Sequence, residues 1–381
     1  MYGKVICAFE KIFGCQPEAI ASAPGRLEIL GNHTDYNEGV VLSCAVDQRT
    51  TAAVRKNNSN QVVICDIRSD SRAVFDLSEL SSGIRPRWAA YPAGVVSELK
   101  HRNINVGGFD AVIDSNVPLS AGMSSSAAFE TAVLYALMKL YDLAIPPAEA
   151  ARIGQGVENN FLGLKTGLLD QFSSIFGVKD SFILSDFRSV EVLETVTMRP
   201  GAAILVVNSM EKHNLVDSEY NRRRAACESA AAKLALRHSN IKTLRDVSSE
   251  LLESEKNILT DEEFRRAKHV VGECERVMLA VDLLKKNDLA AFGKLWWESH
   301  ESSRINFENS TAALDKLVEL SQQLPGALGA RLSGGGFGGI SIHLVEESCL
   351  EAYQHAIADA YAAFSGTRPE MIVCHPGSGA A

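Results

Sequence analysis

The sequence predicts a globular protein of mixed α and β structure with two domains. Its 381 residues exceed what one hydrophobic core usually organises. A content of 46% hydrophobic and 22% charged residues is typical of chains that bury a core. Strand-like and helix-like runs occur along the whole chain, and Pro200-Gly201 interrupts them near its middle. We therefore predict one domain over residues 1–200 and a second over residues 201–381.

The predicted elements follow from hydrophobic periodicity. Phe129, Val133, Leu137 and Leu140 recur at helical spacing, whereas the apolar run at 40–46 follows a glycine and is short, as strands are. The predicted strands span residues 21–22, 27–30, 40–46, 50–55, 62–66, 109–114, 182–184, 190–193, 203–207 and 340–344. The predicted helices span residues 4–16, 88–100, 127–140, 146–160, 217–238, 262–285 and 288–302.

Charge and cysteine content exclude several classes of partner. The net charge of −9 argues against nonspecific binding to nucleic acid or to anionic membranes. No run approaches the ~18 apolar residues that a membrane span needs, and residues 1–13 do not resemble a signal peptide. The eight cysteines are scattered and form no C-x-x-C, which predicts reduced thiols in a cytoplasmic protein and no cysteine metal site.

A loop of small residues at 118–126 precedes the predicted helix at 127–140. It contains Gly122 and three consecutive serines, Ser124, Ser125 and Ser126. A helix N-terminus offers free N–H groups and the positive end of the dipole, which favour an anion such as phosphate. Serine is also a preferred N-cap, which is the simpler explanation of one of the three. The loop lacks the G-x-x-x-x-G-K-[ST] pattern, so any nucleotide site here is not of the P-loop type.

Two further stretches are rich in polar groups or glycine. The loop from Gly31 to Gly39 carries Asn32, His33 and Asp35, and it is either a solvated turn or a recognition loop for a polyhydroxylated ligand. The run at 334–339 has five glycines in six positions between strand-like flanks. Glycine permits close backbone approach, so we expect this run to lie against another group rather than to act as a linker.

Two carboxylates are the candidate ionised groups of a site. Asp170 lies among apolar neighbours, where a carboxylate is either paired with a cation, capping a helix or functional. Glu158, twelve residues earlier, is either a surface charge on a helix or a metal ligand.

Three stretches together resemble the signature motifs of the galactokinase, homoserine kinase, mevalonate kinase and phosphomevalonate kinase superfamily. They are APGRLEILGNHTDYNEGVVL at 23–42, PLSAGMSSSAA at 118–128 and GARLSGGGFGG at 329–339. The first of them, together with GLLDQ at 167–171 and KHNLVDSEYNRRR at 212–224, is similar to the galactokinase branch. The resemblance implies an α+β fold, with an N-terminal domain like ribosomal protein S5, a ferredoxin-like C-terminal domain and the active site between them.

The resemblance also implies phosphorylation of the anomeric C1 hydroxyl of D-galactose by ATP, giving galactose 1-phosphate and ADP. The expected ligands are thus a small sugar and MgATP, bound by a monomer or small homo-oligomer. Ser124, Ser125 and the backbone from Gly122 would wrap the nucleotide phosphates. Ser126 and Glu158 would hold Mg²⁺, which offsets phosphate charge.

The resemblance assigns catalytic roles to Asp170 and Arg26. Asp170 would take the proton of the C1 hydroxyl, as a base or as an orienting group. Arg26 would favour its ionised form and stabilise the transferring phosphoryl. Trp88 would lie by the adenine, and the glycines at 334–339 would close over the site.

The sugar-binding residues implied by the resemblance are Asn32, His33, Asp35, Gly167 and Tyr220. One departure concerns Asn32, where the family pattern has a Glu that binds the C6 hydroxyl in galactokinases. An amide carries no charge, so the alternative function is a sugar 1-kinase for a C6-modified hexose such as galacturonate. A second departure is Glu28, where the family usually has Asn. The remaining alternative is a non-catalytic sugar and ATP sensor, against which the serine loop and Asp170 argue.

Overall fold

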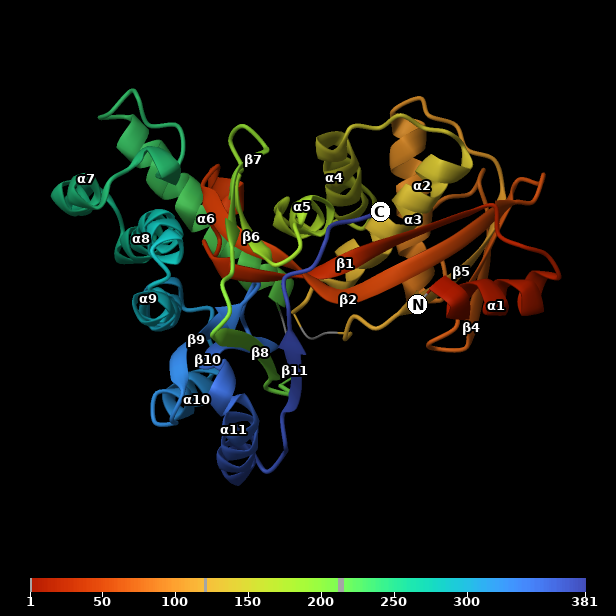
Figure 1. Ribbon diagram of the computed structural model, residues 1–381. Helices are drawn as coiled ribbons and strands as arrows, with labels where there is room; N and C mark the ends of the chain where they lie inside the picture. The colour runs from red at the N-terminus through yellow and green to blue at the C-terminus, as the bar shows by residue number, and fades with distance from the viewer. Residues whose placement is uncertain (1, 120–121, 212–215) are drawn as a thin grey trace.

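Two β-sheets with helices on both faces form the molecule. The computed structural model describes residues 2–119, 122–211 and 216–381. In Figure 1 the long strands β1 and β2 of the larger sheet run to the right, and the strands of the smaller sheet, β8 to β11, lie below the centre. Helices α6 to α9 lie on the left. Among the described residues, no helix has both the length and the apolar character needed to cross a bilayer.

The larger sheet has seven strands, in the order β4-β3-β5-β2-β6-β7 with β1 paired to β2. All neighbouring strands are antiparallel except β3 and β5. The strands are β1 (Ala19–Leu30), β2 (Val40–Lys56), β3 (Gln61–Asp66), β4 (Ser71–Asp76), β5 (Phe109–Ser115), β6 (Ser181–Asp186) and β7 (Glu191–Thr197). The helices around this sheet are α1 (Tyr2–Phe13), α2 (Ala90–His101), α3 (Ser125–Leu140), α4 (Pro147–Gly156) and α5 (Leu169–Phe176).

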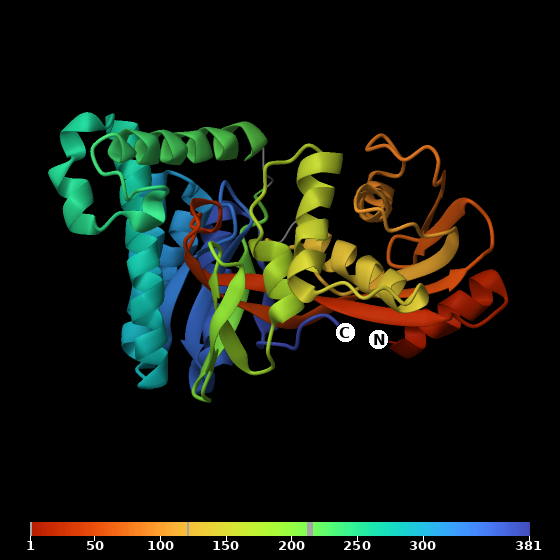
Figure 2. The same cartoon turned by 90° about the horizontal axis from the view of Figure 1, so that it is seen from above.

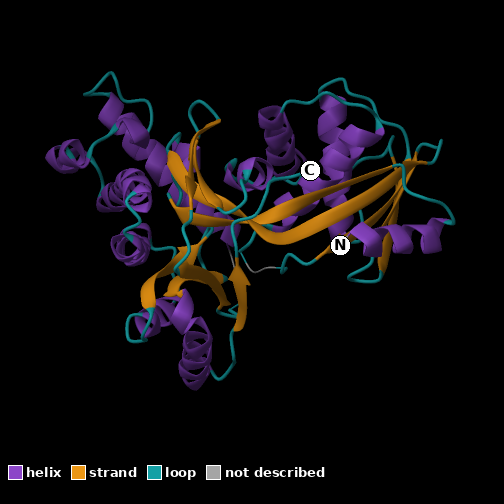
Figure 3. Ribbon diagram, viewed as in Figure 1, coloured by secondary structure: helices purple, strands orange, loops and turns teal. Residues whose placement is uncertain are grey.

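Strand alternation decides which helices cover each face of the larger sheet. Ala52 and Val54 of β2 pack with α2 to α5, whereas Ala53 between them packs under α1 with Val5 and Phe9. Figure 3 shows the two helical layers on opposite sides of the long strands. The apolar stripe of α3 predicted from the sequence therefore faces this core.

The smaller sheet is antiparallel, with the strand order β11-β8-β10-β9. Its strands are β8 (Ala202–Asn208), β9 (Ala327–Ser333), β10 (Ile340–Glu346) and β11 (Glu370–Cys374). The remaining helices are α6 (Val216–Ala235), α7 (Ser249–Ser254), α8 (Asp261–Lys285), α9 (Leu289–Ser302), α10 (Ala312–Ser321) and α11 (Leu350–Ser365). The order 4-1-3-2 with helical crossovers is the ferredoxin-like arrangement that the family resemblance implies, so the fold class is confirmed.

The two sheets share one hydrophobic core at their junction. Leu27 and Leu42 of the long strands pack with Val206 and Ile342 of the smaller sheet and with Trp296 of α9. In Figure 2 strands β1 and β2, which belong to the larger sheet, extend to the blue C-terminal part of the chain. The predicted boundary at residues 200 and 201 lies between β7 and β8, and the division into domains at that point stays a prediction.

Two pairs of predicted strands are single strands in the structure. Strand breaks are expected around Pro24 and around residues 47–49. In the structure the chain instead continues as strand through both places, in β1 and β2, which pair with each other. The register shifts between Pro24 and Arg26, as at a bulge, which is where a strand tolerates proline. The other predicted elements occur within a few residues of their expected ends. β4, α5, α7, α10, α11 and β11 lie outside the predicted elements, and β9 corresponds only to the strand-like flank before the glycine-rich run.

After β11 the chain returns from the smaller sheet to the larger one. Gly377 N–H donates to the carbonyl oxygen of Ala45, and Ala380 N–H to that of Ser174. Ser22 and Ala381 exchange two backbone hydrogen bonds, each with an N···O distance of 2.9 Å. The chain therefore crosses between the two sheets a second time.

Candidate active site

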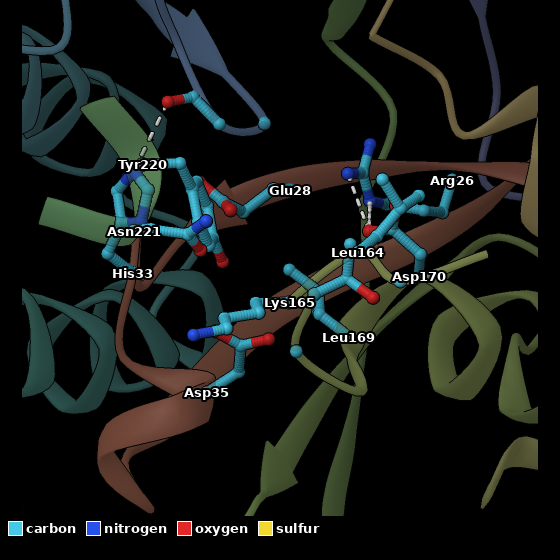
Figure 4. A pocket seen from close by; sticks show the side chains of 15 residues that line it. Arg26, Glu28, His33, Asp35, Leu164, Lys165, Leu169, Asp170, Tyr220 and Asn221 are labelled. Carbon is cyan, nitrogen blue, oxygen red and sulfur yellow. Dashed lines mark hydrogen bonds and ion pairs between the residues drawn. The ribbon is translucent and has the colours of Figure 1, made fainter. Parts of the chain in front are cut away.

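A cavity of about 260 Å³ lies where the two sheets meet. Its walls come from β1, the loop after β1, the segment before α5, the start of α6 and the glycine-rich loop. Figure 4 shows Glu28 and Asp35 facing the same space, with His33 and Tyr220 on one side and the Arg26–Asp170 pair on the other. The lining residues are Arg26, Glu28, His33, Asp35, Gly163, Leu164, Lys165, Thr166, Gly167, Leu169, Asp170, Tyr220, Asn221, Gly334 and Gly335.

Strand β1 places Arg26 and Glu28 on the same wall. Both residues lie in an uninterrupted part of the register with β2, so their side chains point to the same face. Arg26 forms an ion pair with Asp170, with an Nη2–Oδ1 distance of 2.6 Å, and its Nη1 donates to the Gly122 carbonyl at 2.6 Å. One arginine thus holds both the acid and the loop that precedes α3.

Asp170 and the serine run are in direct contact. Ser124 Oγ donates to Asp170 Oδ2 at 2.6 Å. Ser124 has φ 54°, and its side chain makes no capping hydrogen bond to α3. Ser124 therefore occupies the N-cap position of α3, but its hydroxyl is directed at the acid instead of at a backbone N–H of the helix. Asp170 itself lies in the first turn of α5.

Asp35 lies against Gly167, and this contact leaves no room for a side chain. A Cβ atom at Gly167 would lie 1.6 Å from Asp35 Oδ2. Burial raises the pKa of Asp35 to about 6, opposed by backbone hydrogen bonds from Tyr36 and Leu169. The carboxylate therefore lies next to the backbone of the segment before α5 rather than in a solvated turn.

His33 is fixed by neighbours on both ring nitrogens. Tyr36 Oη lies 3.0 Å from its Nδ1, and the Gly335 carbonyl oxygen lies 3.2 Å from its Nε2. Burial lowers the pKa of His33 to about 3, so the ring is neutral near pH 7. The Tyr220 ring lies with its centroid 5.2 Å from that of His33. The imidazole is thus a hydrogen-bonding group held in one orientation.

Asn32 lies behind the cavity wall rather than on it. It is 1% exposed, and its Nδ2 donates to Glu28 Oε1 at 2.9 Å and to the Gly334 carbonyl at 2.8 Å. Asn309 Nδ2 donates to Asn32 Oδ1 at 3.0 Å. Glu28 lines the cavity and Asn32 does not, so direct sugar contact by Asn32 stays a prediction.

Glu158 and Ser126 form a second polar pair near the start of α3. Ser126 Oγ donates to Glu158 Oε1 at 3.2 Å, and Thr166 Oγ1 donates to Oε2 at 2.6 Å. Glu158 is 4% exposed, and burial raises its pKa. A buried carboxylate and a hydroxyl are ligands that suit Mg²⁺. The described residues contain no cluster of three or more acidic, histidine or cysteine groups that could hold a metal, so phosphate oxygens would have to complete the shell.

A second cavity of about 330 Å³ lies at the start of α3. Ser125 and Ser126 line it together with Trp88, whose Nε1 donates to Ser71 Oγ at 3.0 Å. The other lining residues are Thr50, Asp66, Arg68, Ser69, Tyr91, Ile113, Ser115, Leu119 and Phe129. Ser124, which precedes these two serines, donates to Asp170 on the wall of the first cavity. Ser120 and Ala121 of the loop, and residues 212–215 of the 212–224 stretch, lie outside the described residues.

The glycine-rich loop closes the first cavity from the smaller sheet. Gly334 and Gly335 line the cavity, and both precede the turn that leads into β10. Gly336 has φ 82°, and a Cβ there would lie 2.2 Å from the Asn309 carbonyl oxygen. The loop is therefore packed against its neighbours, as the sequence predicts, and is not a linker.

Several lining residues were not among the predicted site residues. They are Glu28, Gly163, Leu164, Lys165, Thr166, Leu169 and Asn221. Glu28 could be found from its spacing, because it lies two residues after Arg26 on a strand. The others carry no local signal and reach the cavity only through tertiary packing.

The comparisons with known proteins agree with this geometry. Residues 8–56 match the galactokinase galactose-binding signature, residues 90–178 the GHMP kinases N terminal domain and residues 280–363 the GHMP kinases C terminal family. The fold and the serine loop are thus those of a GHMP kinase. A galactokinase of Chloroflexus aurantiacus is 38% identical over 98% of this chain and 95% of its own length. The chain belongs to the galactokinase family.

Solved structures give the same result. The Lactococcus lactis galactokinase complexed with galactose has a TM-score of 0.95 and 30% identity, covering 100% of this chain and 99% of that one. The Methanococcus jannaschii mevalonate kinase has a TM-score of 0.63 at 19% identity over 94% of this chain and 98% of that one, which shows the shared fold alone.

Proposed function

We propose that this protein is a galactokinase that transfers the γ-phosphoryl group of ATP to the C1 hydroxyl of D-galactose. Family membership supports the sugar kinase reaction, and a similar protein of the family has been solved with galactose. The observation that carries the proposal is the 2.6 Å hydrogen bond from Ser124 to Asp170. It joins the N-terminal end of α3 to an acid on the wall of a cavity of sugar size.

In this proposal Asp170 and Arg26 carry the catalysis. Asp170 accepts the proton of the C1 hydroxyl or orients that hydroxyl for attack. Arg26 lies at 2.6 Å from the same carboxylate, so a positive charge is fixed where negative charge develops on the transferring group. Ser124 fixes the rotamer of Asp170 from the opposite side.

The nucleotide is assigned to the second cavity and the start of α3. Gly122, Ser124 and Ser125 would bind phosphate oxygens through backbone N–H groups and hydroxyls. Trp88 would pack against the adenine, since it lines the apolar part of that cavity.

We assign the Mg²⁺ that accompanies the nucleotide to Ser126 and Glu158. The buried carboxylate beside a hydroxyl is a fitting pair of oxygen ligands. When bound, the ion offsets charge on the phosphates. The eight cysteines are free thiols, which favours the cytoplasm, and we expect a monomer or a small homo-oligomer.

The sugar is assigned to the first cavity, where His33, Asp35 and Tyr220 offer polar groups. The Asp35 carboxylate can accept hydrogen bonds from two adjacent hydroxyls, and the backbone near Gly167 can bind a third. The sensor alternative gains no support, because Arg26, Asp170 and Ser124 are in contact, as transfer requires.

The proposal is tested by measuring ADP release from MgATP with a panel of hexoses and by identifying the product with phosphorus NMR. Galactose should be the preferred acceptor and should give the 1-phosphate. A 6-phosphate product, or ATP hydrolysis that does not depend on sugar, would contradict the proposal.

A further inference from the structure

The two departures from the family pattern, Glu28 and Asn32, are in contact with each other. Asn32 Nδ2 donates to Glu28 Oε1 at 2.9 Å. The family pattern has an amide at position 28 and a carboxylate at position 32, so this chain carries the same two groups in exchanged positions. A contact between exchanged groups indicates one compensated change rather than two independent ones.

Glu28 is held by a buried cation from the smaller sheet. Arg331 of β9 has a fully buried side chain, and its Nη2 donates to Glu28 Oε1 at 3.0 Å. Its Nη1 donates to the carbonyl oxygens of Glu28 and Ile29 at 2.9 and 3.0 Å. A buried guanidinium needs an anionic partner, and Glu28 supplies it.

One oxygen of Glu28 remains for a ligand. Among the described residues, side-chain hydrogen bonds to Glu28 involve Oε1, from Asn32 and Arg331. The carboxylate lines the first cavity and faces the space shared with Asp35 (Figure 4). The Asn32 amide, in contrast, is engaged by protein groups, since its Nδ2 donates to Glu28 and Gly334 and its Oδ1 accepts from Asn309.

Resting on the proposed function, we propose that Glu28 is the sugar-binding carboxylate that the family carries at position 32. Asn32 and Arg331 are positioning residues that fix its orientation. The cavity therefore keeps a negative wall despite the amide at position 32, and it rejects a hexose with a carboxylate at C6. The galacturonate alternative, which depended on loss of that negative group, is accordingly disfavoured.

The test is a double-mutant cycle with Glu28→Asn, Asn32→Glu and the double variant. Glu28→Asn should lower kcat/KM for galactose roughly 10- to 100-fold, because the carboxylate is lost and Arg331 is left unpaired. Asn32→Glu should have a comparable effect, since two carboxylates would then lie in contact. The double variant restores the family arrangement and should recover to within about threefold of the wild type.

The discriminating measurement is the KM for each substrate. A sugar-binding role raises the KM for galactose and leaves the KM for MgATP unchanged. The melting temperature could fall in both single variants and recover in the double variant while the KM for galactose stays constant. In that case the pair is only structural and the inference is overturned. Additive losses in the double variant would overturn it as well.

Substrate choice provides a second measurement that does not depend on the cycle. Wild type should prefer galactose over galacturonate by roughly 100-fold or more in kcat/KM, and Glu28→Gln should reduce that ratio about tenfold. Glu10→Gln, an exposed carboxylate on α1, is the matched control and should change neither value. Equal turnover of both sugars by the wild type would overturn this inference alone. No turnover of galactose by the wild type would overturn the proposed function and this inference with it.

Discussion

The two cavities beside the start of α3 differ in chemistry and in assembly. The first is lined by charged and polar groups from four parts of the chain that are distant in sequence, from Arg26 to Gly335. The lining residues of the second all lie between Thr50 and Phe129, in the larger sheet, its helices and their loops. They include the aromatic side chains of Trp88, Tyr91 and Phe129. Apolar faces suit a planar base, whereas fixed hydrogen-bonding groups suit a polyol.

The difference in assembly has a functional meaning. A site for a polyol needs many polar groups at fixed distances, so it draws on several rigid elements at once. A site for a base and a phosphate chain can be built locally from a helix N-terminus and aromatic side chains. A substitution in the first cavity should therefore change the KM for the sugar, and a substitution in the second cavity should change the KM for MgATP.

Asp170→Asn should have the largest effect, because it removes the acid that lines the first cavity and accepts from Ser124 at the start of α3. We expect kcat to fall roughly 10³-fold, while the binding of MgATP to the free enzyme stays within about twofold. Single-turnover rates and nucleotide titration provide the two measurements. Asp282→Asn, at an exposed site on α8, is the control. Retained turnover in the Asp170 variant would contradict its catalytic role.

Gly167→Ala should affect the first cavity alone. A Cβ atom at this position lies 1.6 Å from Asp35 Oδ2, so the carboxylate or the segment before α5 must move. The KM for galactose should rise roughly 100-fold, with the KM for MgATP unchanged. Gly3→Ala, where a Cβ meets open space, is the matched control. A parallel rise in both KM values would show that the cavities are not separable.

The pH dependence of galactose binding should reflect Asp35, whose pKa is about 6 because of burial. Its ionised form accepts the sugar hydroxyls, so affinity should fall about tenfold between pH 7.5 and pH 5. The folded pKa lies above the ordinary value, so Asp35 should make the sugar-free protein more stable over the same fall in pH. Calorimetric titration and thermal melting measure the two opposite trends. Asp35→Asn should remove the contribution of this group to both, and unchanged profiles would exclude Asp35 as their origin.

Trp88→Ala should have the smallest effect of the four. Loss of the aromatic wall should raise the KM for MgATP about fivefold to tenfold and leave the galactose KM unchanged. Trp297→Ala, on α9 and outside both cavities, is the aromatic control. Competition with an ATP analogue that lacks the base would sharpen the assignment, since the variant should lose discrimination between the two nucleotides.

The sequence predicts the larger features of this molecule well. The apolar spacing of α3 is regular enough to define that helix, and the serine run and the glycine-rich loop are local signals of close packing. The strand breaks expected at Pro24 and near Asp47 are wrong, because pairing between β1 and β2 outweighs the local preference of those residues. The boundary between residues 1–200 and 201–381 remains a prediction.

The site is less visible in the sequence, for a physical reason. Arg26 and Asp170 are separated by 144 positions, and only the packing of α5 beside β1 brings them together. Family resemblance implies roles for both residues, and it implies sugar contact by Asn32, which in the structure hydrogen-bonds to the cavity-lining Glu28. The contact between Asn32 and Glu28 could not be read from either residue, because a strand end and a buried arginine from β9 decide which side chain faces the cavity.

The second crossing of the chain, from β11 back to Ala45, Ser174 and Ser22, bears on how the two halves can separate. A protease that cuts near Pro200 would break the covalent link between β7 and β8. The C-terminal fragment would still be hydrogen-bonded to Ser22 of β1 through Ala381. A nicked enzyme should therefore elute as a single species under native conditions and fall into two pieces only in denaturant. The two sheets are thus joined by two passages of the chain, one near Pro200 and one after β11.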